Sequence, residues 1–390
     1  MFTIDHERVS ALAKHAAPNS VTLWMPTHRG GRDIREDPIR LKDLLAKAQQ
    51  QLIDLGVRPA EADQRIGLIR RSVANGHFWR TNLDGLGIFL GDGNPQFLRV
   101  PFYTPEIASV CNHFYIKPLL GAPQQNNRFY ILAISENTVR LFSAGRYEFE
   151  AMDLAPGPRN FHEYQVAADI EPQHIEFHSG AAAHATAANR PTMFHGQGAR
   201  GDFDKVRLAE YCRLVDEEVT TTLRGREAPL LLAAAEPLGT IYRQNTHYTP
   251  LSDRIIAGNP DAADPAALHR QAVEVMTDEF LRPIRSAQSR YHRAMAGGLA
   301  SNDIEGILRA ACANAIDVLL VTSQRQLWGR FDHEQGTLEQ RDDQQCGDED
   351  LLNLAAVLAR RGGADVYAVE QRHMPGDSLA AAILRFRLGQ

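Results

Sequence analysis

Cysteine and long apolar runs are scarce in this chain of 390 residues. Its four cysteines, Cys111, Cys212, Cys312 and Cys346, form no C-x-x-C pair, which argues against a disulfide framework or a zinc site. We therefore expect free thiols in a reducing cytosol. No run of about 18 apolar residues occurs, so no membrane span is expected. The start, "MFTIDHERVSALAKH", lacks the uninterrupted apolar region of a signal peptide.

A surplus of positive charge is also missing. The formal net charge is −6 and the sequence pI is about 6.2. A nucleic-acid role therefore requires a local basic patch rather than a basic chain as a whole. Hydrophobic residues make up 44% and charged residues 23%, as in ordinary globular proteins. Since one core rarely grows past roughly 250–300 residues, we expect two or three domains.

Several catalytic signatures are absent as well. The chain has no G-x-S-x-G elbow and no H-E-x-x-H or H-x-x-E-H zinc motif. "GLGIFLGDG" is no dinucleotide fingerprint, because its glycines flank a strand instead of opening a helix. The apolar run "RFYILAI" (128–134) contains no carboxylate, which weighs against a two-metal nuclease of the ribonuclease-H type. We predict no cofactor.

Apolar residues spaced by three and four predict amphipathic helices. The clearest ends at Gly56 and carries one stripe: Leu41, Leu45, Ala48, Leu52 and Leu55. A later helix, capped by Asp202 or Asp204, carries another: Leu208, Tyr211, Cys212, Val215, Val219 and Leu223. Further helices are predicted at 60–74, 268–278 and 279–296, and Asn302 with Glu305 resembles a capping box before one more.

Short apolar runs between turn residues predict strands at 20–25, 86–90, 97–102, 229–238, 316–322 and 381–386. Residues 128–134 and 138–144 form a hairpin, with a third strand in "YEFEAM", and 351–370 follow a helix–glycine–strand pattern. Residues 329–350 are polar and predict a loop. The mixture predicts an α/β protein of three modules: 1–123, a middle domain 124–280, and a small α/β/α domain 281–390.

The stretch "TMFHGQGAR" (192–200) is the main candidate site. Gly196 and Gly198 allow unusual backbone angles and close approach, so the amide of Gln197 is available to an oxyanion or a water. Four basic residues surround it and suit RNA phosphates: Arg190, Arg200, Lys205 and Arg207. The plain alternative is an ordinary flexible loop.

Four histidines fall within 22 residues that end in this stretch: His174, His178, His184 and His195. Their spacing matches no metal motif, so we predict a structural or merely polar role and no metal. A metal-dependent hydrolase that uses these histidines is the weaker alternative. The segment 174–201 is long and rich in alanine, glycine and histidine, as functional or disordered loops are.

A glutamine loop, a long helix and a buried strand in this order resemble the middle domain of archaeo-eukaryotic class 1 release factors and Pelota-type rescue proteins. "RFYILAISENTVRLFSAG" resembles that domain's opening hairpin, and "GGLASNDIEGILRAACANAIDVLLVT" resembles the start of the third domain. "SVTLWMPTHRGGRDIREDPIRLKDLLAKAQ" is similar to the N-terminal module of the bacterial archaeo-eukaryotic release factor families, in particular the subfamily numbered three.

The resemblance implies a ribonuclease-H-like middle domain and a C-terminal domain like kink-turn-binding ribosomal proteins. It further implies a cytoplasmic ribosome-rescue factor whose loop promotes hydrolysis of peptidyl-tRNA. Gln197 matches the motif glutamine and Gly196 the glycine before it, whereas His195 replaces the motif's first glycine. A non-catalytic ribosome- or RNA-binding protein of the same fold is therefore the alternative. Partners would be the ribosome and peptidyl-tRNA. A GTPase partner and the oligomeric state are left open.

Overall fold

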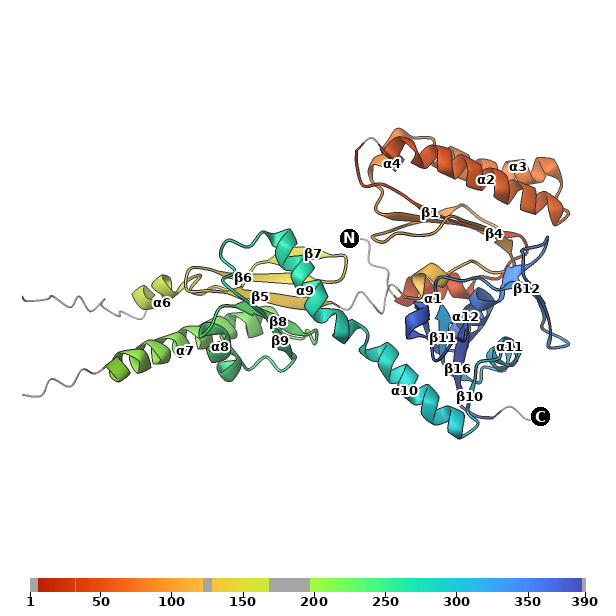
Figure 1. The fold of residues 1–390 in the computed structure, drawn as a ribbon. Helices are drawn as coiled ribbons and strands as arrows, with labels where there is room; N and C mark the ends of the chain where they lie inside the picture. The colour runs from red at the N-terminus through yellow and green to blue at the C-terminus, as the bar shows by residue number, and fades with distance from the viewer. Residues whose placement is uncertain (1–5, 32, 122–127, 168–196, 388–390) are drawn as a thin grey trace, which may run out of the picture. The chain divides into compact units, whose positions relative to one another are not determined.

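The structure is a computed structural model that describes residues 6–31, 33–121, 128–167 and 197–387 (Figure 1). For residues 6 and 197–204 the description covers the backbone alone. The chain divides into two compact units: unit 1 comprises Met1–Asn126 and Glu279–Gln390, and unit 2 comprises Asn127–Asp278. Both units mix helices and sheets, which confirms the predicted α/β class. The division into three modules stays a prediction.

The N-terminal part of unit 1 is a four-stranded antiparallel sheet of order β3-β2-β1-β4. Its strands are β1 Ser20–Pro26, β2 Gly85–Leu90, β3 Gln96–Val100 and β4 Ile107–Cys111. Helices α2 (Asp37–Asp54) and α3 (Pro59–Ser72) cover one face, as Figure 1 shows. The predicted stripe is buried except for Leu55, which follows α2 and is half-buried. Short helices α1 (His6–Lys14) and α4 (Gly76–Arg80) flank this sheet. Strands β1 and β2 are buried on both faces, and the polar Ser20 and Thr22 of β1 are buried with their apolar neighbours.

The C-terminal part of unit 1 holds a second four-stranded sheet of order β10-β16-β11-β15. Its strands are β10 Ala300–Ser301, β11 Ile316–Thr322, β15 Asp365–Val369 and β16 Ala380–Leu384. Helix α10 (Arg282–Ala296) packs on one face. Helices α11 (Ile304–Cys312) and α12 (Leu351–Arg361) pack on the other (Figure 1). This small α/β/α layering agrees with the helix–glycine–strand pattern of residues 351–370.

Two expectations for this part are wrong. Residues 329–350 are not a loop: β12 (Trp328–Asp332) and β13 (Thr337–Arg341) form an antiparallel hairpin that also pairs with β14 (Glu349–Asp350). Strand β12 buries Gly329 and Phe331 and exposes Arg330 and Asp332, whereas β13 has a polar sequence without the apolar alternation of a half-buried strand. The cap of α11 is Asp303 and not Asn302, because its carboxylate accepts from the Gly306 amide at 2.7 Å.

Unit 2 is built on a five-stranded sheet of order β7-β6-β5-β8-β9. The strands are β5 Phe129–Ile134, β6 Val139–Ala144, β7 Phe149–Met152, β8 Leu230–Ala234 and β9 Leu251–Ala257. β5, β6 and β7 run antiparallel as the predicted meander, while β8 and β9 run parallel to β5. Its helices are α6 Phe161–Ala167, α7 Gln197–Thr222, α8 Leu238–Asn245 and α9 Pro265–Phe280, the last of which continues into unit 1.

Helix α7 buries the whole stripe predicted for it, and the stripe packs on β5 and β8. The helix begins at Gln197, however, so Asp202 and Asp204 lie inside it and neither is its cap. Among the described residues, the helices lack the length and hydrophobicity that a membrane crossing needs.

Candidate functional site

Some of the predicted site residues lie among the residues that the structure describes, and others lie outside them. Arg190, His195 and Gly196 lie outside the described residues, as do the other three predicted histidines. Gln197, Gly198 and Arg200 form the first turn of α7, where only the backbone is described. Two basic residues follow on the same helix: Lys205 is exposed and Arg207 is half-buried. The structure thus brings Gln197, Gly198 and three of the four predicted basic residues onto one helix.

Helices α6 and α7 border the segment 168–196 and pack against each other at one end of unit 2 (Figure 1). The Phe161 ring meets the Tyr211 ring edge-on, with centroids 5.6 Å apart. The Tyr164 hydroxyl donates to Glu210 Oε2 at 3.0 Å. The Tyr211 hydroxyl donates to the Ser135 carbonyl, also at 3.0 Å, which ties α7 to the end of β5. We call Phe161, Tyr164, Glu210 and Tyr211 the aromatic clamp.

The tyrosines of the clamp have raised pKa values, and basic side chains lie beside them. Burial and the Glu210 hydrogen bond raise the pKa of Tyr164, while Arg207 and Arg213 oppose that rise. Burial raises the pKa of Tyr211 well above its usual value. Both hydroxyls are hydrogen-bond donors at neutral pH: that of Tyr164 ties α6 to α7, and that of Tyr211 ties α7 to the end of β5. Arg207 lies close enough to Tyr164 to act on its pKa.

A second tie fixes α7 to the chain just before α6. The Arg159 guanidinium pairs with the Glu218 carboxylate and also donates to the Leu154 and Ala155 carbonyls, at 3.1 and 3.0 Å. Burial raises the pKa of Glu218, and Arg159 opposes that rise. Gly157 passes so close that a Cβ there would overlap the Glu218 carboxylate. The chain on either side of residues 168–196 is therefore anchored through α7.

Sequence reasoning missed this clamp. The spacing of apolar residues predicts only that Tyr211 belongs to the buried stripe of α7. It predicts nothing for Phe161 and Tyr164. The available signal was Asn160, three residues before Glu163. Asn160 accepts from the Glu163 amide at 2.8 Å and donates to the Glu163 side chain at 2.9 Å, which is a reciprocal cap of α6.

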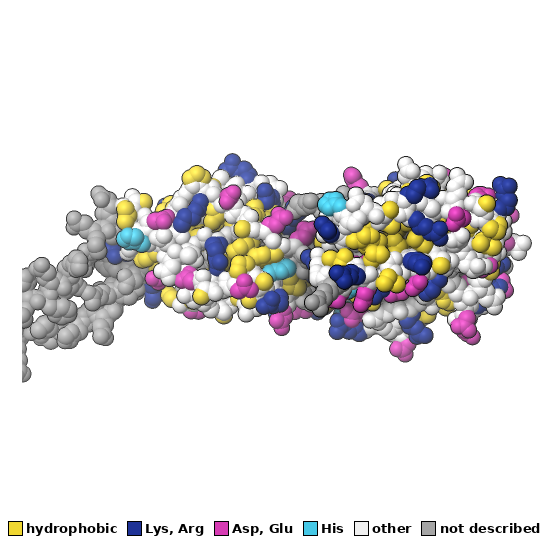
Figure 2. Space-filling model, turned by 90° about the horizontal axis from the view of Figure 1, so that it is seen from above, with side chains coloured by type: hydrophobic (Ala, Val, Ile, Leu, Met, Phe, Trp, Pro, Cys, Tyr) yellow, Lys and Arg dark blue, Asp and Glu magenta, His cyan; other side chains and the backbone are white. Residues whose placement is uncertain are grey.

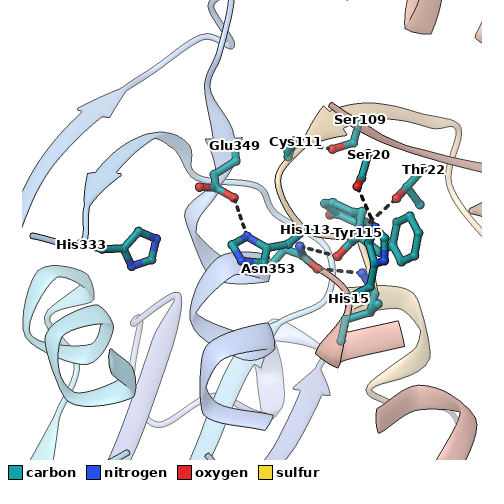
Figure 3. Close-up of polar contacts among 12 residues, drawn as sticks. His15, Ser20, Thr22, Ser109, Cys111, His113, Tyr115, His333, Glu349 and Asn353 are labelled. Carbon is teal, nitrogen blue, oxygen red and sulfur yellow. Dashed lines mark hydrogen bonds and ion pairs between the residues drawn. The ribbon is translucent and has the colours of Figure 1, made fainter. Parts of the chain in front are cut away.

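A second polar cluster lies in unit 1, where its N-terminal and C-terminal parts meet (Figure 3). Asn353 of α12 accepts from the Ile116 and Lys117 amides at 2.8 and 3.1 Å and donates to the Phe114 carbonyl at 3.2 Å. Lys117 Nζ lies 2.6 Å from Asp350 Oδ2. His15 stacks on Phe114, with ring centroids 4.0 Å apart. The bonds of Asn353 join residues more than two hundred positions apart.

The chemistry of this cluster is structural. Burial raises the pKa of the Cys111 thiol to about 12, so the reactive thiolate is absent at neutral pH. His113 Nδ1 lies 3.9 Å from Glu349 Oε2, too far for a hydrogen bond. Across the described ranges, no three His, Cys, Asp or Glu side chains gather as a metal site would require. The cluster therefore joins the two parts of unit 1 and offers no nucleophile.

Comparison with known protein families finds a match that lies within unit 2. Residues 129–278 match bacterial archaeo-eukaryotic release factor family 7. This confirms the resemblance to these families, and the subfamily whose model matches is number seven rather than three. No curated protein matches the chain.

Similar solved structures include three factors. The archaeal translation termination factor aRF1 shares 16% identity over 99% of both chains, with a TM-score of 0.24. Pelota of Archaeoglobus fulgidus shares 12% over 78% of this chain and 81% of its own, with a TM-score of 0.35. Dom34 of S. cerevisiae, a translation termination-like factor that interacts with Hbs1, shares 8% over 77% and 75%, also at 0.35.

Proposed function

Because residues 129–278 match a bacterial archaeo-eukaryotic release factor family, we propose that this chain acts on the ribosome as a release or rescue factor. Gln197 promotes hydrolysis of the ester bond of peptidyl-tRNA. The partners are the ribosome and its peptidyl-tRNA, with a GTPase acting alongside, and the location is the cytoplasm. The family match over unit 2 carries the proposal.

The position of Gln197 supports this role. It is the first residue of a helix of 26 residues. The first four amides of a helix lack acceptors within it and attract developing negative charge. The helix body is held by the aromatic clamp and by the Arg159–Glu218 pair. A rigid helix anchored in a sheet positions a reactive group better than a free loop does.

The reaction needs little from the protein itself. Water attacks the ester carbonyl carbon, the bond to the tRNA ribose oxygen breaks, and that oxygen takes up the proton lost by the water to become a hydroxyl. Gln197 contributes a neutral amide that donates and accepts hydrogen bonds, which suits the placing of a water. Gln197→Ala removes this side-chain amide and keeps the backbone amide, and loss of one positioned side-chain donor typically costs about 100- to 1000-fold in rate. Gln197→Ala is therefore expected to lower peptide release by about that factor.

The test is release of a labelled peptide from stalled ribosome complexes. Wild type and Gln271→Ala, an exposed glutamine on α9 in the same unit, should release peptide equally. Gln197→Ala should not. Restoring the motif glycine with His195→Gly should keep release at the wild-type rate or above. Equal release by the Gln197 and Gln271 variants would overturn the role of Gln197.

The non-catalytic alternative gives a different result in the same experiment. Wild type would then sediment with ribosomes, in a salt-dependent way, and release no peptide. Failure to sediment with ribosomes at all would overturn both the catalytic proposal and this alternative.

A further inference from the structure

Unit 1 contains a cavity that the proposed role of Gln197, a residue of unit 2, leaves unused. Its volume is about 170 Å³. Gln51 and Asp54 of the last turn of α2 line it, together with Leu55, Val110 of β4 and residues 344–348 between β13 and β14. The cavity thus lies between the N-terminal and C-terminal parts of unit 1, and we call it the α2 cavity.

The wall formed by the loop between β13 and β14 is held in place by buried charge. The Asp348 side chain is 0% exposed and pairs with both Arg330 and Arg341. Its carboxylate also accepts from the Gln345 amide at 2.9 Å. Gly347 has a φ of +80°, and a Cβ there would lie 2.7 Å from Arg330 Nη2. The wall is therefore preformed, as the walls of ligand sites usually are.

Gln51 brings to the α2 cavity an acceptor that lacks a donor. Its Nε2 donates to the Ala108 carbonyl at 3.2 Å, which fixes the orientation of the amide. Its Oε1 is buried and has no hydrogen-bond partner among the described residues. Because buried polar atoms nearly always have a partner, such an atom on a residue that lines a cavity indicates a donor supplied from outside the chain.

Asp54 gives the α2 cavity a negative charge. Its Oδ1 accepts from Gln50 Nε2 at 2.8 Å, and this neutral partner leaves the charge in place. The last turn of α2 holds no basic residue, although that end of a helix favours cations over carboxylates. None of the described residues that line the cavity is basic. Two exposed acids, Asp342 and Asp343, directly precede the lining residue Gln344. A cation suits this setting.

We propose that the α2 cavity binds the ammonium group of a short aliphatic amine. A cavity of about 150 Å³ holds benzene, so the α2 cavity has room for a ligand of about six to eight heavy atoms. An ammonium group donates three hydrogen bonds, which suits the Gln51 amide oxygen and the Asp54 carboxylate. The apolar side chains of Leu55 and Val110 complete the lining and suit the methylene groups of the amine.

An anion or a metal ion fits the α2 cavity less well. The nearby arginines, Arg330 and Arg341, already pair with Asp348 and Glu339. Within the described ranges, no three His, Cys, Asp or Glu side chains gather as a metal would require. Figure 2 shows charges of both signs dispersed over the face that it presents, so surface charge alone singles out no ligand. The α2 cavity stands apart because it combines an enclosed volume, a carboxylate and an unpaired acceptor.

The ammonium group can come from a free diamine or from a lysine side chain of a partner protein. Isothermal titration calorimetry with the full chain distinguishes the two, with putrescine for the first and Nα-acetyl-lysine amide for the second. We expect a dissociation constant of about 0.1–1 mM for one of them. Tighter binding of putrescine assigns the cavity to free diamines, and tighter binding of the lysine amide assigns it to a partner protein. Absence of binding by both, or equal binding of the uncharged butane-1,4-diol, would overturn the proposal.

Three variants test which residues hold the amine. Asp54→Asn removes the charge and should weaken binding about 5- to 20-fold. Gln51→Met removes the unpaired acceptor at similar length and should weaken binding about tenfold. Asp43→Asn is the control, because Asp43 is an exposed acid of α2 that lies about 16 Å from Asp54 along the helix axis. It should bind as wild type does. Equal affinities for wild type and all three variants would contradict the proposed site.

Alkylation of Cys346 measures occupancy in the wild-type chain, without any substitution. Cys346 is exposed and lines the α2 cavity, whereas Cys312 is exposed and is not part of the lining. The amine at about ten times its dissociation constant leaves about one cavity in ten empty. Reaction of Cys346 with iodoacetamide, followed by peptide mapping, should therefore slow by up to about tenfold, and that of Cys312 should not change. Unchanged reaction of Cys346, equal slowing at both thiols, or equal protection of Cys346 by magnesium chloride would overturn the proposal.

This proposal and the role of Gln197 fail separately. If the chain binds the amine with the expected pattern of variants but releases no peptide, the hydrolytic role falls and the α2 cavity stands as an amine site. If the chain releases peptide but binds neither amine, the amine site falls and the role of Gln197 stands.

Discussion

Replacement of Lys117 by methionine is expected to destabilise unit 1 by about 3 kcal/mol. The Lys117 and Asp350 side chains are 3% and 0% exposed, and Nζ lies 2.6 Å from Oδ2. The ammonium also donates to the Arg325 carbonyl at 2.6 Å. Methionine keeps the apolar stem of the side chain but leaves a buried carboxylate without its counter-charge. Removal of one partner of such a pair typically costs about 3–5 kcal/mol.

The remaining partners of Asp350 place the expected loss at the lower end of that range. Its carboxylate still accepts from the Tyr115 hydroxyl at 3.0 Å and from the Leu327 and Leu352 amides, both at 3.1 Å. Three retained donors stabilise the charge in part, because hydrogen bonds to a charged group are each worth about 1.5–3 kcal/mol.

Tryptophan fluorescence measures this effect in the right unit. The chain has three tryptophans, Trp24, Trp79 and Trp328, and all of them lie in unit 1. With an m-value of about 2–3 kcal/mol/M, the urea midpoint should fall by about 1–1.5 M. Lys42→Met, at an exposed lysine, should stay within about 0.5 kcal/mol of wild type. A loss of unfolding free energy below about 1 kcal/mol for Lys117→Met is what an exposed ion pair would give, and it would refute the reasoning.

Two further predictions concern the packing around β1 and β2. Burial lowers the pKa of His15, aided by Arg361 and His113 and opposed by Asp92. Its neutral form therefore stabilises unit 1 fully above the ordinary pKa of about 6.5, and this contribution is lost as pH falls. The urea midpoint should drop more for wild type than for His15→Gln between pH values of about 7.5 and 5.5, and equal drops would contradict this cause. A Cβ at Gly87 would lie 2.7 Å from the Trp24 ring, whereas one at Gly93 would meet nothing within 4 Å. Gly87→Ala should thus lower the thermal midpoint by an amount equivalent to about 1–3 kcal/mol, and a midpoint equal to that of Gly93→Ala would sink the argument.

Periodicity predicted the elements that have one apolar face. The stripe of α7 and the leucines of α2 are buried as their spacing implied, because a helix repeats every 3.6 residues. The hairpin of β12 and β13 and strand β9 escaped prediction, since Thr337–Arg341 and Leu251–Ala257 show no clean alternation of buried and exposed residues.

Contacts between distant parts of the chain left no signal in a single sequence. Asn353 reads as an ordinary polar residue inside a helix, yet it accepts two amides from residues 116 and 117. The candidate site, too, could be predicted only in part. Gln197 was found through its motif, whereas the clamp residues Tyr164 and Glu210 belong to different helices and meet only in the fold.

The Asn353 bonds also set an order of events during synthesis. Ile116 and Asn353 are 237 residues apart. At about 5–20 residues per second, the N-terminal sheet waits about 10–50 s for α12 to be translated. The strands and helices of unit 2 are complete in sequence before that moment, so unit 2 is free to fold first. We expect the earlier half of unit 1 to become protease-resistant only after α12 leaves the ribosomal tunnel. The first residues to be made are thus among the last to reach their final packing.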